Sequence, residues 1–129
     1  MFDTWAWHEI LNGTPTGSKL RRKYLEDEDT RVLTADVSLA ELSAKLAEIG
    51  KSDAIPAAID AIIEASNDVV AISRDDAVQA GPLRAELRKT SKNASMVDAV
   101  LLSMARNRDA TLISCDSAFK GQSDVHCER

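Results

Sequence analysis

The chain has 129 residues, a length typical of one globular domain with its own hydrophobic core. Apolar residues make up 44% of it and charged residues 29%, which excludes a disordered or fibrous protein. Its 16 Lys and Arg against 21 Asp and Glu give a formal net charge of −5, which argues against non-specific DNA binding through a basic face. No apolar stretch approaches the roughly 20 residues of a membrane span, and Asp3 stands where a secretory signal would carry a basic residue. We therefore expect a cytoplasmic protein without a membrane segment.

The first half of the chain predicts short strands and amphipathic helices. In chain order we expect a strand over residues 1–3, helices over 5–11 and 18–25, a strand over 31–35, and helices over 38–49 and 53–65. Asn12-Gly13 and Gly50 are typical signals for the ends of helices. Pro56 is compatible with the first turn of the helix that contains it.

The second half continues the alternation. We expect a strand over 69–72, a helix over 75–88 that is interrupted or bent near Gly81-Pro82, a helix over 95–106, and strands over 111–114 and 125–127. Short apolar strands that alternate with helices indicate a parallel sheet covered on both faces. With no linker or repeat in the sequence, residues 1–129 are predicted to form a single α/β domain.

Four acids stand where hydrophobic segments begin or end: Asp3, Glu41, Asp98 and Asp116. A buried carboxylate is costly unless a positive charge compensates it. In parallel sheets, sites lie beyond the carboxyl ends of the strands, and all four acids are predicted at strand ends or in the first turns of helices. If they converge in one crevice, we expect a divalent metal as the compensating charge.

Each of these acids also has a simpler interpretation as a helix cap. Ser38-x-x-Glu41 is a full capping box, and Ser95-x-x-Asp98 resembles one with Asp in place of Glu. The other two acids can cap the helical turns that follow them. Asp98 carries the strongest functional signal, because its helix is apolar nearly all round and is expected to be largely buried.

The order and spacing of these acids resemble the PIN-domain ribonuclease family, and especially its VapC-like toxins. The resemblance spans essentially the whole chain. Its segments are Phe2-Asp3-Thr4, Val37-Ser38-Leu39-Ala40-Glu41-Leu42, Met96-Val97-Asp98-Ala99-Val100-Leu101 and Leu112-Ile113-Ser114-Cys115-Asp116-Ser117-Ala118-Phe119. Family members usually carry several apolar residues before the first Asp, whereas only Met1 and Phe2 precede Asp3. The first strand is therefore expected to be very short.

The resemblance implies a three-layer α/β/α sandwich around a mostly parallel sheet of about five short strands. It also implies that Asp3, Glu41, Asp98 and Asp116 hold one or two Mg²⁺ or Mn²⁺ ions, for which hard oxygen ligands are suited. The implied substrate is single-stranded or loop RNA, and the implied partners are a second copy of the chain and an antitoxin that occupies the active site. The expected reaction is metal-supported hydrolysis that leaves a 5′-phosphate and a 3′-hydroxyl.

Further residues are candidates for supporting roles. Thr4 and Ser117 directly follow two of the acids, where a hydroxyl can orient a metal-bound water or a phosphate, although Ser117 can equally cap a helix. Arg88, Lys89 and Lys92 lie in a basic segment before the Asp98 helix. They are candidate contacts to RNA phosphates, with an exposed polar loop as the alternative.

The two cysteines do not have the spacing of a zinc site or of a disulfide framework. We expect Cys115 and Cys127 to be reduced, packed thiols, with a disulfide between them as the alternative.

Other functions remain open beside the toxin. One is a housekeeping RNA-processing nuclease, which the sequence does not distinguish from a toxin. Another is a catalytically silent PIN-like binding domain, against which the presence of all four acids argues. A receiver-like phosphoacceptor domain would need a second acid beside Asp3 and a Lys directly after a late strand, and this chain has neither.

Overall fold

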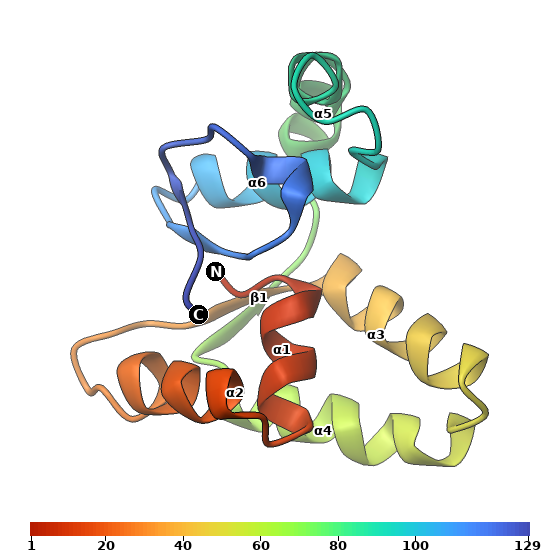
Figure 1. Ribbon diagram of the computed structural model, residues 1–129, viewed down its shortest axis with the longest axis vertical. Helices are drawn as coiled ribbons and strands as arrows, with labels where there is room; N and C mark the ends of the chain where they lie inside the picture. The colour runs from red at the N-terminus through yellow and green to blue at the C-terminus, as the bar shows by residue number, and fades with distance from the viewer.

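Helices dominate the chain, and a narrow sheet runs between them (Figure 1). The structure, a computed structural model, describes residues 1–129. The α-helices are α1 (Thr4–Leu11), α2 (Pro15–Leu20), α3 (Asp36–Glu48), α4 (Ile55–Ala65), α5 (Arg74–Leu87) and α6 (Met96–Arg106). Shorter helical turns are η1 (Arg21–Leu25), η2 (Ser52–Ala54) and η3 (Ser117–Phe119). None of these helices is both long enough and apolar enough to pass through a bilayer.

The sheet consists of two strand pairs joined by one residue. Strand β1 (Leu33–Ala35) pairs in parallel with β2 (Asp68–Val70), and β3 (Leu112–Ile113) pairs in parallel with β4 (Val125–His126). Phe2 forms parallel bridges to both β1 and β3, so the spatial order is β2, β1, Phe2, β3, β4. The predicted parallel sheet is confirmed, although its strands are shorter than expected and the strand over 1–3 is a single bridging residue.

Alternate residues of the sheet pack against different helices, because successive side chains of a strand point to opposite faces. Phe2 and Ile113 belong to a buried cluster with residues of α1, α2, α3 and α4. Met1 and Leu112 belong to a second cluster built mainly by α5 and α6. The two helical groups lie on opposite sides of the sheet in Figure 1, which confirms the predicted three-layer arrangement.

Trp7 fixes α1 on its face of the sheet. Its indole is 1% exposed and meets the Phe2 ring edge-on, with 5.0 Å between the ring centroids. Its Nε1–H donates to Thr34 Oγ1 at 3.1 Å, which satisfies the polar atom that a buried Trp carries. The orientation of α1, and of the residue that precedes it, therefore follows from this contact with β1.

The helix predicted over 18–25 starts earlier and is not one α-helix. Thr14 caps it by accepting from Gly17 N–H at 2.9 Å, and Pro15 occupies the first helical position. After α2 the chain continues as the π-helical turn η1. The segment ends at Leu25 as predicted, and Thr14-Pro15 is the signal in the sequence for its earlier start.

Two other helices differ from their predictions. Helix α3 begins at Asp36, and its N-cap Ala35 has no side chain that can accept a hydrogen bond, so the predicted Ser38–Glu41 capping box is absent. Helix α5 runs through Pro82 as one element, so no interruption occurs there. Pro82 removes the hydrogen bond to the carbonyl of Val78, whose side chain is 66% exposed, and solvent can reach this face of the helix.

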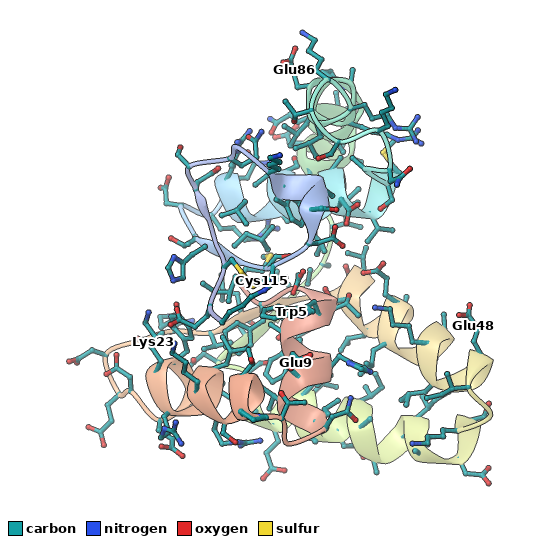
Figure 2. All side chains as sticks on the ribbon, in the orientation of Figure 1. Trp5, Glu9, Lys23, Glu48, Glu86 and Cys115 are labelled. Atoms are coloured by element: carbon teal, nitrogen blue, oxygen red, sulfur yellow. A yellow bond between two sulfur atoms is a disulfide. The ribbon has the colours of Figure 1, made fainter.

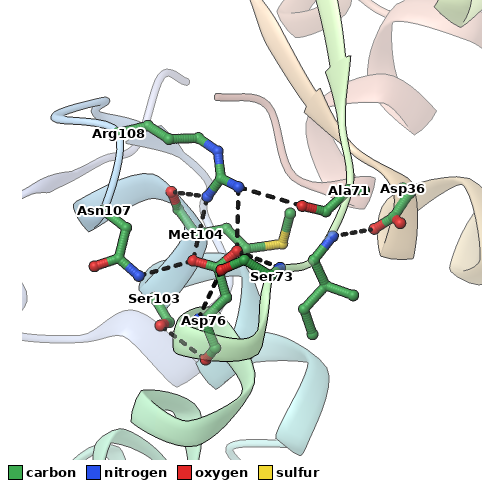
Figure 3. Close-up of polar contacts among 9 residues, drawn as sticks. Asp36, Ala71, Ser73, Asp76, Ser103, Met104, Asn107 and Arg108 are labelled. Atoms are coloured by element: carbon green, nitrogen blue, oxygen red, sulfur yellow. Dashed lines mark hydrogen bonds and ion pairs between the residues drawn. The ribbon is translucent and has the colours of Figure 1, made fainter.

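A buried ion pair joins α5 to the end of α6 (Figure 3). Asp76 is fully buried and lies 3.1 Å from Arg108, and it also accepts from Asn107 at 2.7 Å and from Ser73 N–H at 2.8 Å. Burial alone would raise the pKa of Asp76, but the hydrogen bonds from Arg108, Ser73 and Asn107 hold this pKa below its ordinary value. Arg108 also donates to the Ala71 carbonyl at 3.2 Å, which ties the end of β2 to the same network.

Cys115 and Cys127 form a disulfide, with 4.6 Å between their Cα atoms. The expectation of two reduced thiols is therefore wrong, and the alternative is observed. The reason is the parallel pairing of β3 and β4, continued by Ser114 N–H donating to the His126 carbonyl at 3.0 Å, which brings the next residues of both strands together.

The contact between α1 and α2 gives a test of this packing. A Cβ at Gly17 would overlap the backbone carbonyl of Glu9, so we expect Gly17→Ala to lower the free energy of unfolding by about 2–3 kcal/mol. Gly81→Ala is a matched control, because Gly81 in α5 has open space around it, and we expect no loss and a gain of up to about 1 kcal/mol. Urea denaturation followed by circular dichroism measures both variants. Equal losses would contradict the close approach of the two helices.

Candidate active site

Three of the four predicted acids follow strands or open helices at one edge of the sheet. Asp3 follows the bridging Phe2 and caps α1, Asp116 follows β3 and caps η3, and Asp98 lies in the first turn of α6. Glu41 lies one turn deeper in its helix than expected, because α3 begins at Asp36. Carboxyl ends of parallel strands meet at the same edge, so this placement is typical of a site in an open α/β sheet.

Asp3 is the most deeply buried of the four, with 5% of its surface exposed. Its Oδ1 accepts from Ala6 N–H at 2.9 Å, which is the N-cap bond of α1. Burial raises the pKa of Asp3 from 3.8 to about 6. The hydrogen bonds from Ser114 and Ala6 lower this pKa, whereas the negative charges of Asp116 and Glu41 raise it further.

Asp3 differs from the other buried acids of this protein because no basic side chain pairs with it. Three acids are buried, and two of them have ion pairs: Asp76 with Arg108, and Glu128 with Lys23. Asp3 has no ion pair, and the charges that act on it most strongly are other carboxylates. A buried carboxylate in such surroundings favours the binding of a cation from solution.

Glu41 is held by Thr4. The Thr4 hydroxyl donates to Glu41 Oε1 at 2.5 Å and so connects the start of α1 to α3. Ser38, predicted as the capping partner of Glu41, is instead buried with a hydroxyl that has no hydrogen-bond partner. The side-chain partner of Thr4 is therefore Glu41.

Asp98 is half-buried and is engaged in the capping box of α6. Its Oδ2 accepts from Ser95 N–H at 2.8 Å, while its own N–H donates to Ser95 Oγ at 3.1 Å. This is the simpler interpretation that the sequence offered. Asp98 makes no hydrogen bond to the other three acids, and its charge is not among the main influences on the pKa of Asp3.

Ser114 is a site residue that the sequence reasoning missed. It is 2% exposed at the end of β3, its Oγ accepts from Asp116 N–H at 3.1 Å, and its side chain lowers the pKa of Asp3. A polar residue that ends the apolar run Leu112-Ile113 was the signal available in the sequence. Ser117 lies at the start of η3 and is exposed, and its carbonyl accepts from Ser91 Oγ at 2.6 Å.

The four acids share one pattern of hydrogen bonding. One carboxylate oxygen of each accepts from a nearby group: Asp3 from Ala6, Glu41 from Thr4, Asp98 from Ser95 and Asp116 from Ala118. The second oxygen of Glu41, Asp98 and Asp116 accepts no hydrogen bond from the protein. Helix capping orients Asp3, Asp98 and Asp116, and the Thr4 hydroxyl orients Glu41.

These acids do not form a finished coordination shell. The charges of Glu41 and Asp116 reach Asp3, but no three Asp, Glu, His or Cys side chains lie close enough together to hold a metal ion as they stand. The chemistry of the donors fits a hard divalent cation. Binding by all four acids would need their carboxylates to come closer together.

Two of the three basic residues in the segment before α6 already have partners within the protein. Arg88 Nε donates to the Ala94 carbonyl at 3.0 Å, and Lys89 pairs with Glu86 at 2.9 Å. Lys92 is exposed and has no partner. A groove of about 390 Å³ beside this segment is lined by Lys89, Arg106 and Lys120, and Lys120 also lines the hollow that contains Asp116.

The family of the chain follows from a sequence comparison. The family model described as the PIN domain matches residues 1–123, nearly the whole molecule. The chain belongs to the PIN-domain family. Comparison with curated protein sequences finds no significant match.

Several solved structures have the same PIN fold. A chain of VapBC2 from Rickettsia felis, bound to a DNA fragment from its promoter, has a TM-score of 0.76 and 19% identity, covering 99% of this chain and 96% of that chain. A chain of DNA-bound VapBC from Salmonella typhimurium has a TM-score of 0.74 and 18% identity, covering 99% and 95%. VapC20 of Mycobacterium tuberculosis, described as a sarcin–ricin loop cleaving toxin, has a TM-score of 0.66 and 22% identity, covering 97% of both chains.

The raised pKa of Asp3 predicts how stability depends on pH without metal. Between about pH 4 and 6 the folded state binds more protons than the unfolded state, so ionisation of Asp3 destabilises the fold as the pH rises through this range. At pH 7.5 in EDTA, Asp3→Asn should raise the free energy of unfolding by about 1–3 kcal/mol, because Asn keeps an oxygen for the Ala6 cap. At pH 4 the difference should largely disappear.

Urea denaturation of both proteins at the two pH values measures this effect. Asp116→Asn is the control, since Asp116 is exposed and its neutralisation should change stability far less. An Asp3→Asn variant that is less stable than the wild type at pH 7.5 would contradict an uncompensated charge at this position.

Proposed function

We propose that this PIN-domain protein is a metal-dependent endoribonuclease that acts as the toxin of a toxin–antitoxin pair. One observation carries the proposal: Asp3 is the only buried acid without an ion pair, and its charged neighbours are Glu41 and Asp116. A structural acid would have a cation of its own, as Asp76 and Glu128 do. In a nuclease the missing cation is supplied by Mg²⁺ or Mn²⁺.

In this proposal the four acids hold one or two ions and differ in how firmly they are placed. Asp3 is the anchor, because burial and the Ala6 cap fix its carboxylate. Thr4 orients Glu41 through its hydroxyl. Asp98 and Asp116 each offer a second oxygen that no backbone group occupies. When bound, the metal supplies Lewis-acid stabilisation of the scissile phosphate and activates water as the nucleophile.

The substrate is proposed to be single-stranded or loop RNA. An RNA strand brings phosphates to an acidic cluster only if cations beside it offset the repulsion. Lys120 connects the hollow at Asp116 with the groove that also contains Lys89. Lys92 is exposed without a partner, so Lys92 and Lys120 are the cations most available to phosphates, ahead of Arg88 and Lys89.

Two protein partners belong to the proposal. An antitoxin is supported by the structural neighbours from Rickettsia felis and Salmonella typhimurium, which are VapBC complexes, and by one from Klebsiella pneumoniae described as a toxin–antitoxin complex. A homodimer is proposed on the family resemblance alone. The toxin role rather than housekeeping RNA processing is favoured by these same neighbours.

A cleavage assay tests the activity. Purified protein is incubated with a single-stranded RNA and with an RNA stem-loop that mimics the sarcin–ricin loop, in Mg²⁺, Mn²⁺ or EDTA. We expect cleavage only with metal, and a loss of about 100-fold or more for Asp98→Asn. Asp60→Asn, an exposed acid on α4, is the matched control and should cleave like the wild type.

The products and the host response separate the alternatives. A 5′-phosphate on the downstream product agrees with the proposal, whereas a 2′,3′-cyclic phosphate would indicate a metal-independent contaminant. Cleavage that persists in EDTA, or in the Asp98→Asn variant, would contradict the proposed mechanism. Expression in a bacterial host should arrest growth unless Asp98 is replaced or a neighbouring antitoxin gene is co-expressed, and an active enzyme without growth arrest would favour RNA processing.

A further inference from the structure

The disulfide lies directly beside one of the proposed metal ligands. Cys115 is bonded to Cys127 and is the residue before Asp116, and both cysteines are the only ones in the chain. Figure 2 shows Cys115 where the half made of α5 and α6 meets the half made of α1 to α4. A covalent link therefore holds the turn from which Asp116 enters the site.

A small thiol can reach this disulfide. Cys127 is exposed and Cys115 is half-buried, and both line the same hollow of about 260 Å³ that Asp116 lines. Exposed disulfides are among those that exchange readily with thiols. A molecule that enters this hollow can therefore reach both the disulfide and Asp116.

Few other contacts hold Asp116. It is exposed, its N–H donates to Ser114 Oγ at 3.1 Å, and its Oδ1 accepts from Ala118 N–H at 2.9 Å. The Asp116 carbonyl also accepts from Phe119 N–H at 3.2 Å, so all of these bonds lie within residues 114–119. By contrast, the opposite end of the disulfide stays anchored after reduction, because Glu128 is buried and lies 2.8 Å from Lys23 on η1.

We propose that Cys115 and Cys127 form a reversible redox site that sets the metal affinity of the carboxylate cluster through Asp116. This inference rests on the proposed function. Oxidised, the link holds Asp116 in register with β4 and therefore beside Asp3. Reduced, the turn keeps the bond from Ser91 Oγ to the Ser117 carbonyl at 2.6 Å and the buried Ala118 and Phe119, but it loses its covalent link to the end of β4. Part of the metal-binding free energy is then spent on ordering Asp116.

The chemistry is thiol–disulfide exchange with a dithiol reductant. A thiolate of the reductant attacks one sulfur of the disulfide, the S–S bond breaks, and a mixed disulfide forms with release of the other protein thiolate, which takes up a proton. The second thiol of the reductant then displaces the remaining protein sulfur. Two electrons and two protons have passed to the protein, and the reductant leaves as a disulfide. A disulfide oxidant reverses the sequence.

The experiment compares metal binding by the two redox forms. Isothermal calorimetry with Mn²⁺ is carried out on the air-oxidised protein, on protein reduced with a dithiol that is then removed under nitrogen, and on the Cys115→Ser/Cys127→Ser double variant. We expect the dissociation constant for Mn²⁺ to be about 10-fold higher in the last two samples, as for loss of a group that supports a metal ligand. Mass spectrometry after alkylation counts the free thiols in each sample.

Asp116→Asn is the control that distinguishes an effect through Asp116 from a general effect of the disulfide on the structure. In this variant the oxidised and reduced forms should bind Mn²⁺ with equal affinity, because the ligand through which the disulfide acts is gone. If the double variant does not fold, the comparison of oxidised with reduced wild-type protein still tests the inference.

The two proposals fail in different ways. If both redox forms of the wild type bind Mn²⁺ equally while Asp98→Asn weakens binding, the redox inference is overturned and the proposed function stands. Two free thiols in the air-oxidised protein would overturn the inference as well. If neither form binds Mn²⁺ or Mg²⁺, the proposed function fails and the inference fails with it.

Discussion

Phe2 carries the only backbone pairing that joins the two halves of the sheet. Its N–H donates to the Leu33 carbonyl at 3.1 Å, and on its other side Ile113 N–H donates to the Met1 carbonyl at 2.8 Å. The next residue, Asp3, donates its own N–H to the Ile113 carbonyl at 3.3 Å. The first three residues thus join the two halves of the sheet and place the first acid between β1 and β3.

This position explains why Asp3 is buried and why its burial is costly. The residue must enter the sheet to complete the pairing, and the same pairing removes its carboxylate from water. The other buried acids in this protein stabilise the fold because each forms an ion pair with a basic side chain, as Asp76 does with Arg108. Asp3 meets no cation, so its charge opposes folding above the raised pKa of about 6. A residue that destabilises the apoprotein and is nevertheless held in place by backbone bonds is typical of a functional site.

The sequence predicted elements whose signals are local. Six helical segments were predicted and six α-helices are present, although α2 starts earlier than predicted and ends at Leu20. The Ser95–Asp98 capping box is present as the spacing suggested. What depends on pairing between distant segments was not predictable in the same way. Strands of two or three residues carry almost no periodicity, the role of Ser114 follows from its position between two other segments, and the disulfide follows from the register of β4 against β3. The Ser38–Glu41 box failed for a related reason, since the backbone continues the helix one turn earlier, to Asp36, and Ser38 falls inside it.

Capping and metal binding are alternative explanations for Asp3, Asp98 and Asp116, and in the proposed site the two are compatible. A cap fixes one carboxylate oxygen and the backbone around it, which lowers the entropy lost when the other oxygen binds a ligand. The acids differ in what fixes the backbone that carries them. Asp3 is held by burial within the sheet, so its state responds to pH, whereas Asp116 is exposed and its turn is held by a covalent bond that thiols can open. Two parts of one proposed site are therefore sensitive to different chemistry, because two different forces position them.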